Sequence, residues 1–149
     1  MAPRYAPDQL EAYLQRIGYA NSAGGTGLIR LQQLHQSIQE NALAALAELQ
    51  RRHLGSIPWG NSAIHYSQHH SISTHPSAVF EKLVVRRLDG YCMENTNLLY
   101  VVLLSLGYQV YPSAGRVSSA AADPKNAGPD ARYGSLYGSP PPYTVVSRR

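Results

Sequence analysis

One segment near the middle of the chain is apolar on nearly all sides. Residues 97–106 are mostly Leu, Val and Tyr, and Gly107 closes the run. A helix of this kind belongs at the centre of a fold, because it has no polar face to turn towards water. The segment opens after Gly90 with Cys92, the only cysteine in 149 residues. The sequence therefore predicts a central helix that carries a thiol in its first turn.

The position of Cys92 allows two interpretations. A helix N-terminus carries partial positive charge and unpaired N–H donors, which favour the thiolate, the nucleophilic form of cysteine. A lone cysteine on an apolar helix is more often a small core residue. Position alone leaves both the catalytic and the structural interpretation open.

The composition fits one globular domain. The chain is 44% hydrophobic and 15% charged, and 149 residues are enough to bury a core. A single cysteine excludes an internal disulfide. The net charge of +4 comes from scattered basic residues, whereas nucleic-acid binders carry a cluster. No apolar run approaches the roughly 20 residues that span a bilayer. We expect a cytoplasmic protein that binds neither nucleic acid nor membrane.

Helical periodicity predicts a first helix over about residues 9–17. Asp8 and Glu11 have the spacing of a capping box, with Asp8 as the N-cap. Gly18 supplies a stop signal. The predicted apolar face consists of residues at helical spacing: Leu10, Tyr13, Leu14 and Ile17.

A second, long helix is predicted from about Thr26 through His53, with a break near Glu40-Asn41. The segment is rich in strong helix formers but is long for a globular helix. A short third helix is predicted over residues 79–84. The intervening residues 67–76 predict a solvated loop without a metal, because three histidines there match no zinc-ligand spacing: His69, His70 and His75.

After the central helix the pattern changes to a strand and then loses all periodicity. Residues 108–111 alternate like a strand, which resumes after Pro112. From Ser118 onward small residues and prolines dominate. The predicted class is mainly α with a short β segment. It comprises a helical domain over residues 1–107 with the cysteine, the first strand or strands of an incomplete β domain over 108–117, and a disordered tail over 118–149.

Several strings, in order along residues 8–117, resemble the arylamine N-acetyltransferase family. The family motif R-G-G-x-C-x-E is similar to Leu88-Asp89-Gly90-Tyr91-Cys92-Met93-Glu94. The family strings RIG, HL..IPFEN, HYS, KLV and LGF.V....ARV are similar to residues 16–18, 53–61, 65–67, 82–84 and 106–117. The resemblance implies the N-terminal helical bundle of that fold and the beginning of its β-barrel.

The resemblance also implies acyl transfer through a covalent intermediate. Cys92 would take an acetyl group from acetyl-CoA and pass it to an arylamine or a hydrazine. A histidine that an aspartate orients would activate the thiol, and no bound cofactor is expected. Glu94 and Gly90 would be structural, with Glu94 accepting hydrogen bonds from the loop before the cysteine. Three residues would lie near the acyl site: Tyr91, Trp59 and Asn61.

The chain departs from the family strings around the cysteine. Leu88 and Asp89 stand where the family motif has Arg and Gly, and Gly60 stands where PFEN has Glu. All six histidines precede Cys92, whereas the catalytic histidine and aspartate of the family follow the cysteine. We therefore expect a truncated chain in which acyl transfer is impaired. Truncation would also leave one face of the central helix incompletely covered: Leu98, Leu99, Val102 and Leu103.

Two alternative functions remain open from the sequence. The chain could be a catalytically inactive helical remnant or interaction module that keeps the cysteine. It could also be a papain-like or transglutaminase-like enzyme that recruits an upstream histidine, for which a ring nitrogen must come within hydrogen-bond reach of Cys92. The histidines available to the second alternative are His69, His70 and His75.

Overall fold

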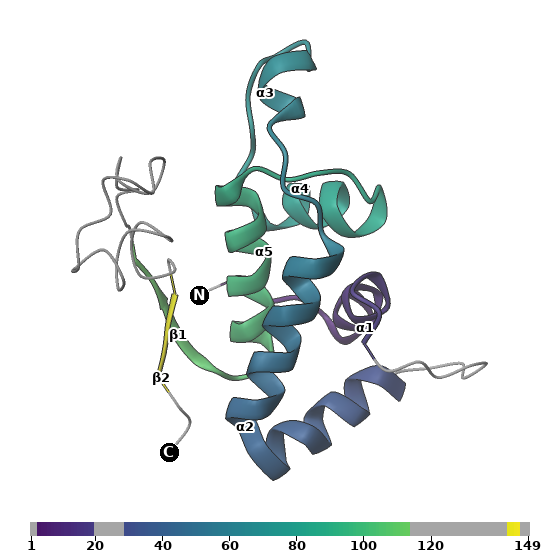
Figure 1. Ribbon diagram of the computed structural model, residues 1–149, viewed down its shortest axis with the longest axis vertical. Coiled ribbons are helices and arrows are strands. Elements are labelled where there is room, and N and C mark those ends of the chain that lie inside the picture. Colours follow the sequence, from purple (N-terminus) through teal and green to yellow (C-terminus); the bar gives the residue numbers. More distant parts are fainter. Residues whose placement is uncertain (1–2, 20–28, 114–142, 147–149) are drawn as a thin grey trace, which may run out of the picture.

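The computed structural model describes residues 3–19, 29–113 and 143–146, and helices dominate this part of the chain (Figure 1). The mainly α class with a short β segment is confirmed. None of the described helices is both long enough and apolar enough to cross a bilayer. In chain order the elements are α1 (Pro7–Arg16), α2 (Ile29–Ser56), α3 (Ser62–Tyr66), α4 (Pro76–Phe80), the π-helical turn η1 (Glu81–Val85), α5 (Cys92–Ser105), β1 (Gln109–Pro112) and β2 (Tyr143–Val146).

Helix α5 is the centre of the fold, as its apolar sequence predicts. Helix α4 and strand β1 both pack on it (Figure 1). Each fully buried Leu or Val contributes roughly 1.5–3 kcal/mol to folding. The expected incomplete cover on one face of α5 is wrong, because neighbouring elements enclose all four residues: Leu98, Leu99, Val102 and Leu103.

Helix α1 begins at Pro7, ahead of the predicted start. Proline at the first helical position is already set to the helical φ and lacks an N–H that would need a partner. The N–H of Ala6 donates to Oε1 of Gln9 at 3.0 Å. Asp8 therefore lies inside the helix, and the capping box predicted for Asp8 and Glu11 is wrong.

The Glu11 carboxylate instead caps the start of α2. Its Oε2 accepts the N–H of Leu31 at 2.9 Å, and its Oε1 accepts the Arg30 guanidinium at 3.0 Å. The first N–H groups of a helix have no partner within the helix, so a carboxylate satisfies them and favours the helix dipole. This polar contact joins α1 to α2 beside their shared apolar core.

Arg16 ties the end of α1 to two other elements. Its Nε donates to the Leu83 carbonyl of η1 at 3.1 Å, and its Nη1 donates to the Ser56 carbonyl of α2 at 2.8 Å. Gly18 follows with φ +65°, a left-handed conformation that glycine adopts without strain. These contacts give the string Arg16-Ile17-Gly18 a structural reason.

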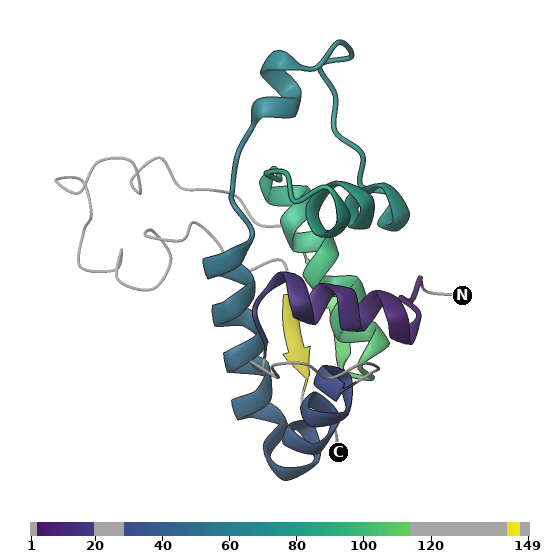
Figure 2. The same cartoon turned by 90° about the vertical axis from the view of Figure 1, so that its right-hand side faces the viewer.

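The predicted break in α2 is confirmed at Asn41. Its φ of −156° and ψ of 94° are not helical, and the two halves of α2 meet at an angle (Figure 2). The side-chain Oδ1 of Asn41 accepts the N–H of Ala44 at 3.0 Å and so caps the second half. The predicted start near Thr26 lies outside the described residues.

The short helix predicted over residues 79–84 begins earlier, at Pro76, and changes character along its length. It starts as α4 and continues as the π turn η1, in which the N–H of Arg86 donates to the Glu81 carbonyl at 2.9 Å. Helix α3, within a stretch where the sequence predicts no element, lies beyond the ends of α2 and α5 (Figures 1 and 2).

The two strands form an antiparallel pair, with Val110 opposite Val145. Strand β1 overlaps the strand predicted over 108–111 but includes Pro112, where the sequence predicts an interruption. Residues 114–117 lie outside the described range. The disordered tail predicted over 118–149 also falls on residues outside this range, apart from Tyr143–Val146. These four residues form β2, a strand that the sequence pattern does not predict. Aromatic and β-branched residue types, which make up this segment, are enriched in strands.

A histidine is buried in the helical core. His53 is 3% exposed, and its Nδ1 lies 3.0 Å from the Tyr13 hydroxyl. Burial lowers the pKa of His53 from 6.5 to about 4, against a smaller opposing effect of a hydrogen bond to the Asn95 backbone. The ring is therefore neutral at pH 7, and its hydrogen bond satisfies two buried polar groups.

We predict that the free energy of unfolding falls by about 2 kcal/mol between pH 7 and pH 5 because of His53. The unfolded chain takes up the proton first, at 6.5, so this contribution is present above that pH and is lost as the pH falls towards 4. Urea unfolding at the two pH values measures it. His53→Gln should flatten the difference, and His35→Gln, an exposed position of the same helix, should not. An equal pH effect in both variants would contradict the prediction.

Candidate active site

Cys92 is the first residue of α5, and it is exposed. Tyr91, the N-cap, has an extended backbone, so the chain turns sharply into the helix at this point. The thiol lies beside the unpaired N–H groups of the first helical turn, where negative charge is favoured. This placement agrees with the prediction of a cysteine in the first turn of the central helix.

Glu94 fixes the turn that leads to Cys92. Its side chain is 2% exposed, and its carboxylate accepts the N–H of Tyr91 at 2.9 Å. Both carboxylate oxygens also lie 2.8 Å from Nζ of Lys82, a residue of η1 that is 19% exposed. A buried carboxylate needs such partners, because an unpaired one loses its hydration without compensation.

Gly90 joins the loop after α2 to the start of α5. Its N–H donates to the Pro58 carbonyl at 3.0 Å, and its carbonyl accepts the N–H of Gly60 at 2.9 Å. The Asn95 side chain donates to the same carbonyl at 2.8 Å. A β-carbon at Gly90 would lie 2.8 Å from a methyl carbon of Leu83. Only glycine therefore fits at this position without a shift in the core.

Trp59 and Tyr91 come together next to the cysteine. Their ring centroids are 6.0 Å apart at an interplanar angle of 34°, a favourable tilted arrangement. The Trp59 side chain is nevertheless 64% exposed, so it forms an open wall. Asn61 is the N-cap of α3, and among the described residues its side chain makes no hydrogen bond. The structure thus brings together two of the three residues expected near the acyl site.

Asp89 contacts the same loop, a role that the sequence pattern did not predict. Its Oδ1 accepts the Ser62 hydroxyl at 2.5 Å, and its Oδ2 accepts the Ser62 N–H at 3.3 Å. The hydroxyl hydrogen bond holds the pKa of Asp89 below its usual value. The departure of Asp89 from the family motif is the signal that could have drawn attention to it.

Two of the three histidines available to the upstream-histidine alternative, His70 and His75, contact other groups. Nδ1 of His70 lies 2.8 Å from the Ile64 carbonyl, and Nδ1 of His75 lies 2.8 Å from the Ser77 hydroxyl. Within the described ranges no hydrogen bond joins a histidine to Cys92. The alternative with a recruited upstream histidine therefore gains no support. In the same part of the chain no group of three His, Cys, Asp or Glu side chains could hold a metal ion.

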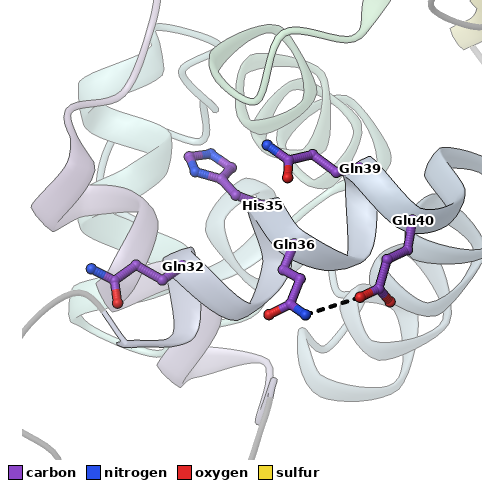
Figure 3. Close-up of a pocket in the computed structure, with 5 residues that line it drawn as sticks. All are labelled: Gln32, His35, Gln36, Gln39 and Glu40. Atoms are coloured by element: carbon purple, nitrogen blue, oxygen red, sulfur yellow. Dashed lines mark hydrogen bonds between the residues drawn. The ribbon is translucent and has the colours of Figure 1, made fainter.

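A hollow of about 640 Å³ lies away from the cysteine, along the first half of α2 (Figure 3). All of its lining residues belong to this one helix, and Gln36 donates to Glu40 at 2.9 Å across its turn. One polar helix face does not enclose a ligand, so the hollow is no competitor for the site at Cys92. Its lining residues are Gln32, His35, Gln36, Gln39 and Glu40.

A family model for N-acetyltransferases matches residues 42–130, which is more than half of the chain. The chain belongs to the arylamine N-acetyltransferase family. It is 35% identical to an N-malonyltransferase of Fusarium pseudograminearum over 135 residues, 91% of this chain and 38% of that protein. It is 26% identical to arylamine N-acetyltransferase 2 of Mesocricetus auratus over 119 residues, 80% of this chain and 35% of that protein.

Solved arylamine N-acetyltransferases share the fold. The enzyme of Nocardia farcinica matches with a TM-score of 0.59 and 26% identity, over 97% of this chain and 41% of that one. The enzyme of Mycobacterium abscessus matches with a TM-score of 0.57 and 26% identity, over 99% and 43%. The chain thus spans less than half of the length of these relatives, and the part it shares with them includes the cysteine helix.

We predict that Glu94→Ala lowers the free energy of unfolding by about 3 kcal/mol, because it leaves Lys82 without its partner and frees the Tyr91 N–H. Urea unfolding followed by circular dichroism measures the loss. Glu81→Ala, which removes an exposed carboxylate from the neighbouring turn η1, is the control and should change stability by less than about 0.5 kcal/mol. Similar stabilities for the two variants would show that the ion pair does not support the turn.

Proposed function

We propose that Cys92 is the nucleophile of an N-acyltransferase that uses acyl-CoA as donor and an arylamine or hydrazine as acceptor. The observation that carries the proposal is an exposed thiol at the first residue of α5 in a member of this family. Glu94 and Gly90 hold the turn before it. Trp59 and Tyr91 form one wall of the acyl site, and Asn61 lies on the loop that continues from that wall.

The reaction proceeds in two balanced steps. The Cys92 thiolate attacks the thioester carbonyl carbon, a new carbon–sulfur bond forms, and CoA leaves with its thiolate sulfur. The amine nitrogen then attacks the acyl-cysteine, loses a proton, and releases the Cys92 sulfur. Splitting the transfer in this way gives each step a good leaving group. The helix N-terminus stabilises negative charge on the sulfur before the first step and after the second.

The acyl group is the finer part of the proposal. One relative is named for malonyl transfer and another for acetyl transfer, so both donors belong in the test. Within the described residues no histidine is hydrogen-bonded to Cys92. We infer that acyl-cysteine formation and turnover are slow, because no histidine of the described residues is hydrogen-bonded to the thiol to act as its base.

We predict that Cys92 gains an acetyl or a malonyl group when the chain is incubated with the corresponding acyl-CoA. Intact-mass spectrometry measures the adduct, and peptide mapping assigns it to Cys92. Cys92→Ala, which removes the sulfur, should show no adduct. Adding an arylamine should discharge the adduct only slowly, with little further release of CoA. A chain that forms no adduct with either donor would contradict the proposal and favour the non-catalytic interaction module.

A further inference from the structure

Asp89 and Gly60 compete for one space beside the active-site turn. A β-carbon built on Gly60 would lie 2.0 Å from Oδ2, 2.8 Å from Cγ and 2.9 Å from Cβ of Asp89. Non-bonded carbon atoms prefer separations of about 3.5–4.0 Å, so such a side chain is excluded. The Asp89 carboxylate fills the volume that any other residue at position 60 needs. The two positions therefore form a matched pair.

The carboxylate cannot leave this position without breaking hydrogen bonds. It accepts the Ser62 hydroxyl at 2.5 Å and the Ser62 N–H at 3.3 Å. Hydrogen bonds to an ionised acceptor are about twice as strong as those between neutral groups. The N-cap of α3, Asn61, makes no side-chain cap of its own, so Asp89 supplies one from another segment. Asp89 thus ties the loop from Pro58 to Ser62 to the segment that enters α5.

We propose that Asp89 is a positioning residue of the acyl-transfer site. Its carboxylate packs against Gly60 and holds the Trp59 loop beside the segment of Tyr91 and Cys92. It acts through the Trp59 and Tyr91 rings, 6.0 Å apart. The inference rests on the proposed function for the role of Cys92, whereas the contact between positions 60 and 89 stands on its own.

The same two positions are where the chain departs from the family strings that it resembles. They place a glutamate at the position of Gly60 and a glycine at the position of Asp89. In this chain the glycine and the carboxylate residue have exchanged places across a direct contact. The two departures compensate each other, because in either arrangement one position is glycine and the other carries a single carboxylate side chain. A change at either position alone would leave two side chains in one space, or none.

Two single-residue reporters make this testable in the full chain, since it contains one tryptophan and one cysteine. The test measures acrylamide quenching of Trp59 fluorescence and the rate at which iodoacetamide alkylates Cys92. The variants are Gly60→Glu, Asp89→Gly and the double exchange. Gly60→Glu alone should change the alkylation rate by about threefold or more, the low end for residues in contact, and should also shift the quenching constant of Trp59. The double exchange should return both rates to within about twofold of the original chain.

Gly55→Ala is the matched control, because a β-carbon there meets no atom within 4 Å, and both rates should stay unchanged. Asp89→Asn keeps the shape and one acceptor for Ser62, so its rates should lie between those of the original chain and Asp89→Ala. If Gly60→Glu fails to fold and Asp89→Gly restores folding, the coupling is shown in its strongest form. If neither variant folds, a double-mutant cycle of Ser62→Ala and Asp89→Ala takes their place. Effects of these two substitutions on the rates that do not add would support the inference.

Effects of the two exchanges that simply add would overturn the inference, as would Asp89→Ala with both rates unchanged. Neither measurement needs acyl-CoA, so the outcome is separate from that of the proposed function. Additive rates together with an acyl adduct on Cys92 would leave the function standing and remove only the role of Asp89. Coupled rates without an adduct would keep the pair and remove the function.

Discussion

The main-chain hydrogen bonds of Gly90 are the constraint on which the rest of the site depends. They join the loop after α2, at Pro58 and Gly60, to the last residues before α5. Segments about thirty residues apart in the sequence therefore meet at the helix that carries the thiol. Leu83 fills the space beside Gly90, so a side chain at this position would disturb the contact between the two segments. Trp59 and Tyr91 become neighbours as a consequence of this backbone contact.

Carboxylates at helix starts complete this framework. Glu94 caps its own helix α5, whereas Glu11 caps α2 and Asp89 caps α3 from other segments. In each case a carboxylate meets N–H groups that have no partner within the helix, so the helix dipole favours its charge. The same groups that satisfy the helix ends thereby fix how the elements are placed around Cys92.

The sequence predicted the features that depend on local pattern. The segment that is apolar on nearly all sides predicted the central helix with Cys92 in its first turn. The length and composition of the second predicted helix indicated the break near Asn41. It could not predict the contacts of Glu11 and Asp89, whose partners Leu31 and Ser62 lie 20 and 27 residues away. Capping rules consider only neighbours within one turn, so they assigned Glu11 to the wrong helix.

The covered face of α5 shows a second limit of the sequence. Periodicity identifies which residues are apolar but not how many neighbouring elements cover them. All four of the residues concerned are buried in a fold in which α4 and β1 pack on α5. The expected exposed face therefore depended on an assumption about the fold as a whole. The family strings, in contrast, drew attention to the turn before Cys92, where the hydrogen bonds show structural reasons for the glycine and the glutamate.

Amide hydrogen exchange, followed by NMR, tests the central claim that this backbone join holds the site together. The amides of Gly60 and Gly90 donate to carbonyls across the join, so they should be protected to a similar degree as amides within α5. Exchange of both amides as fast as in unstructured peptide, while α5 stays protected, would contradict the account.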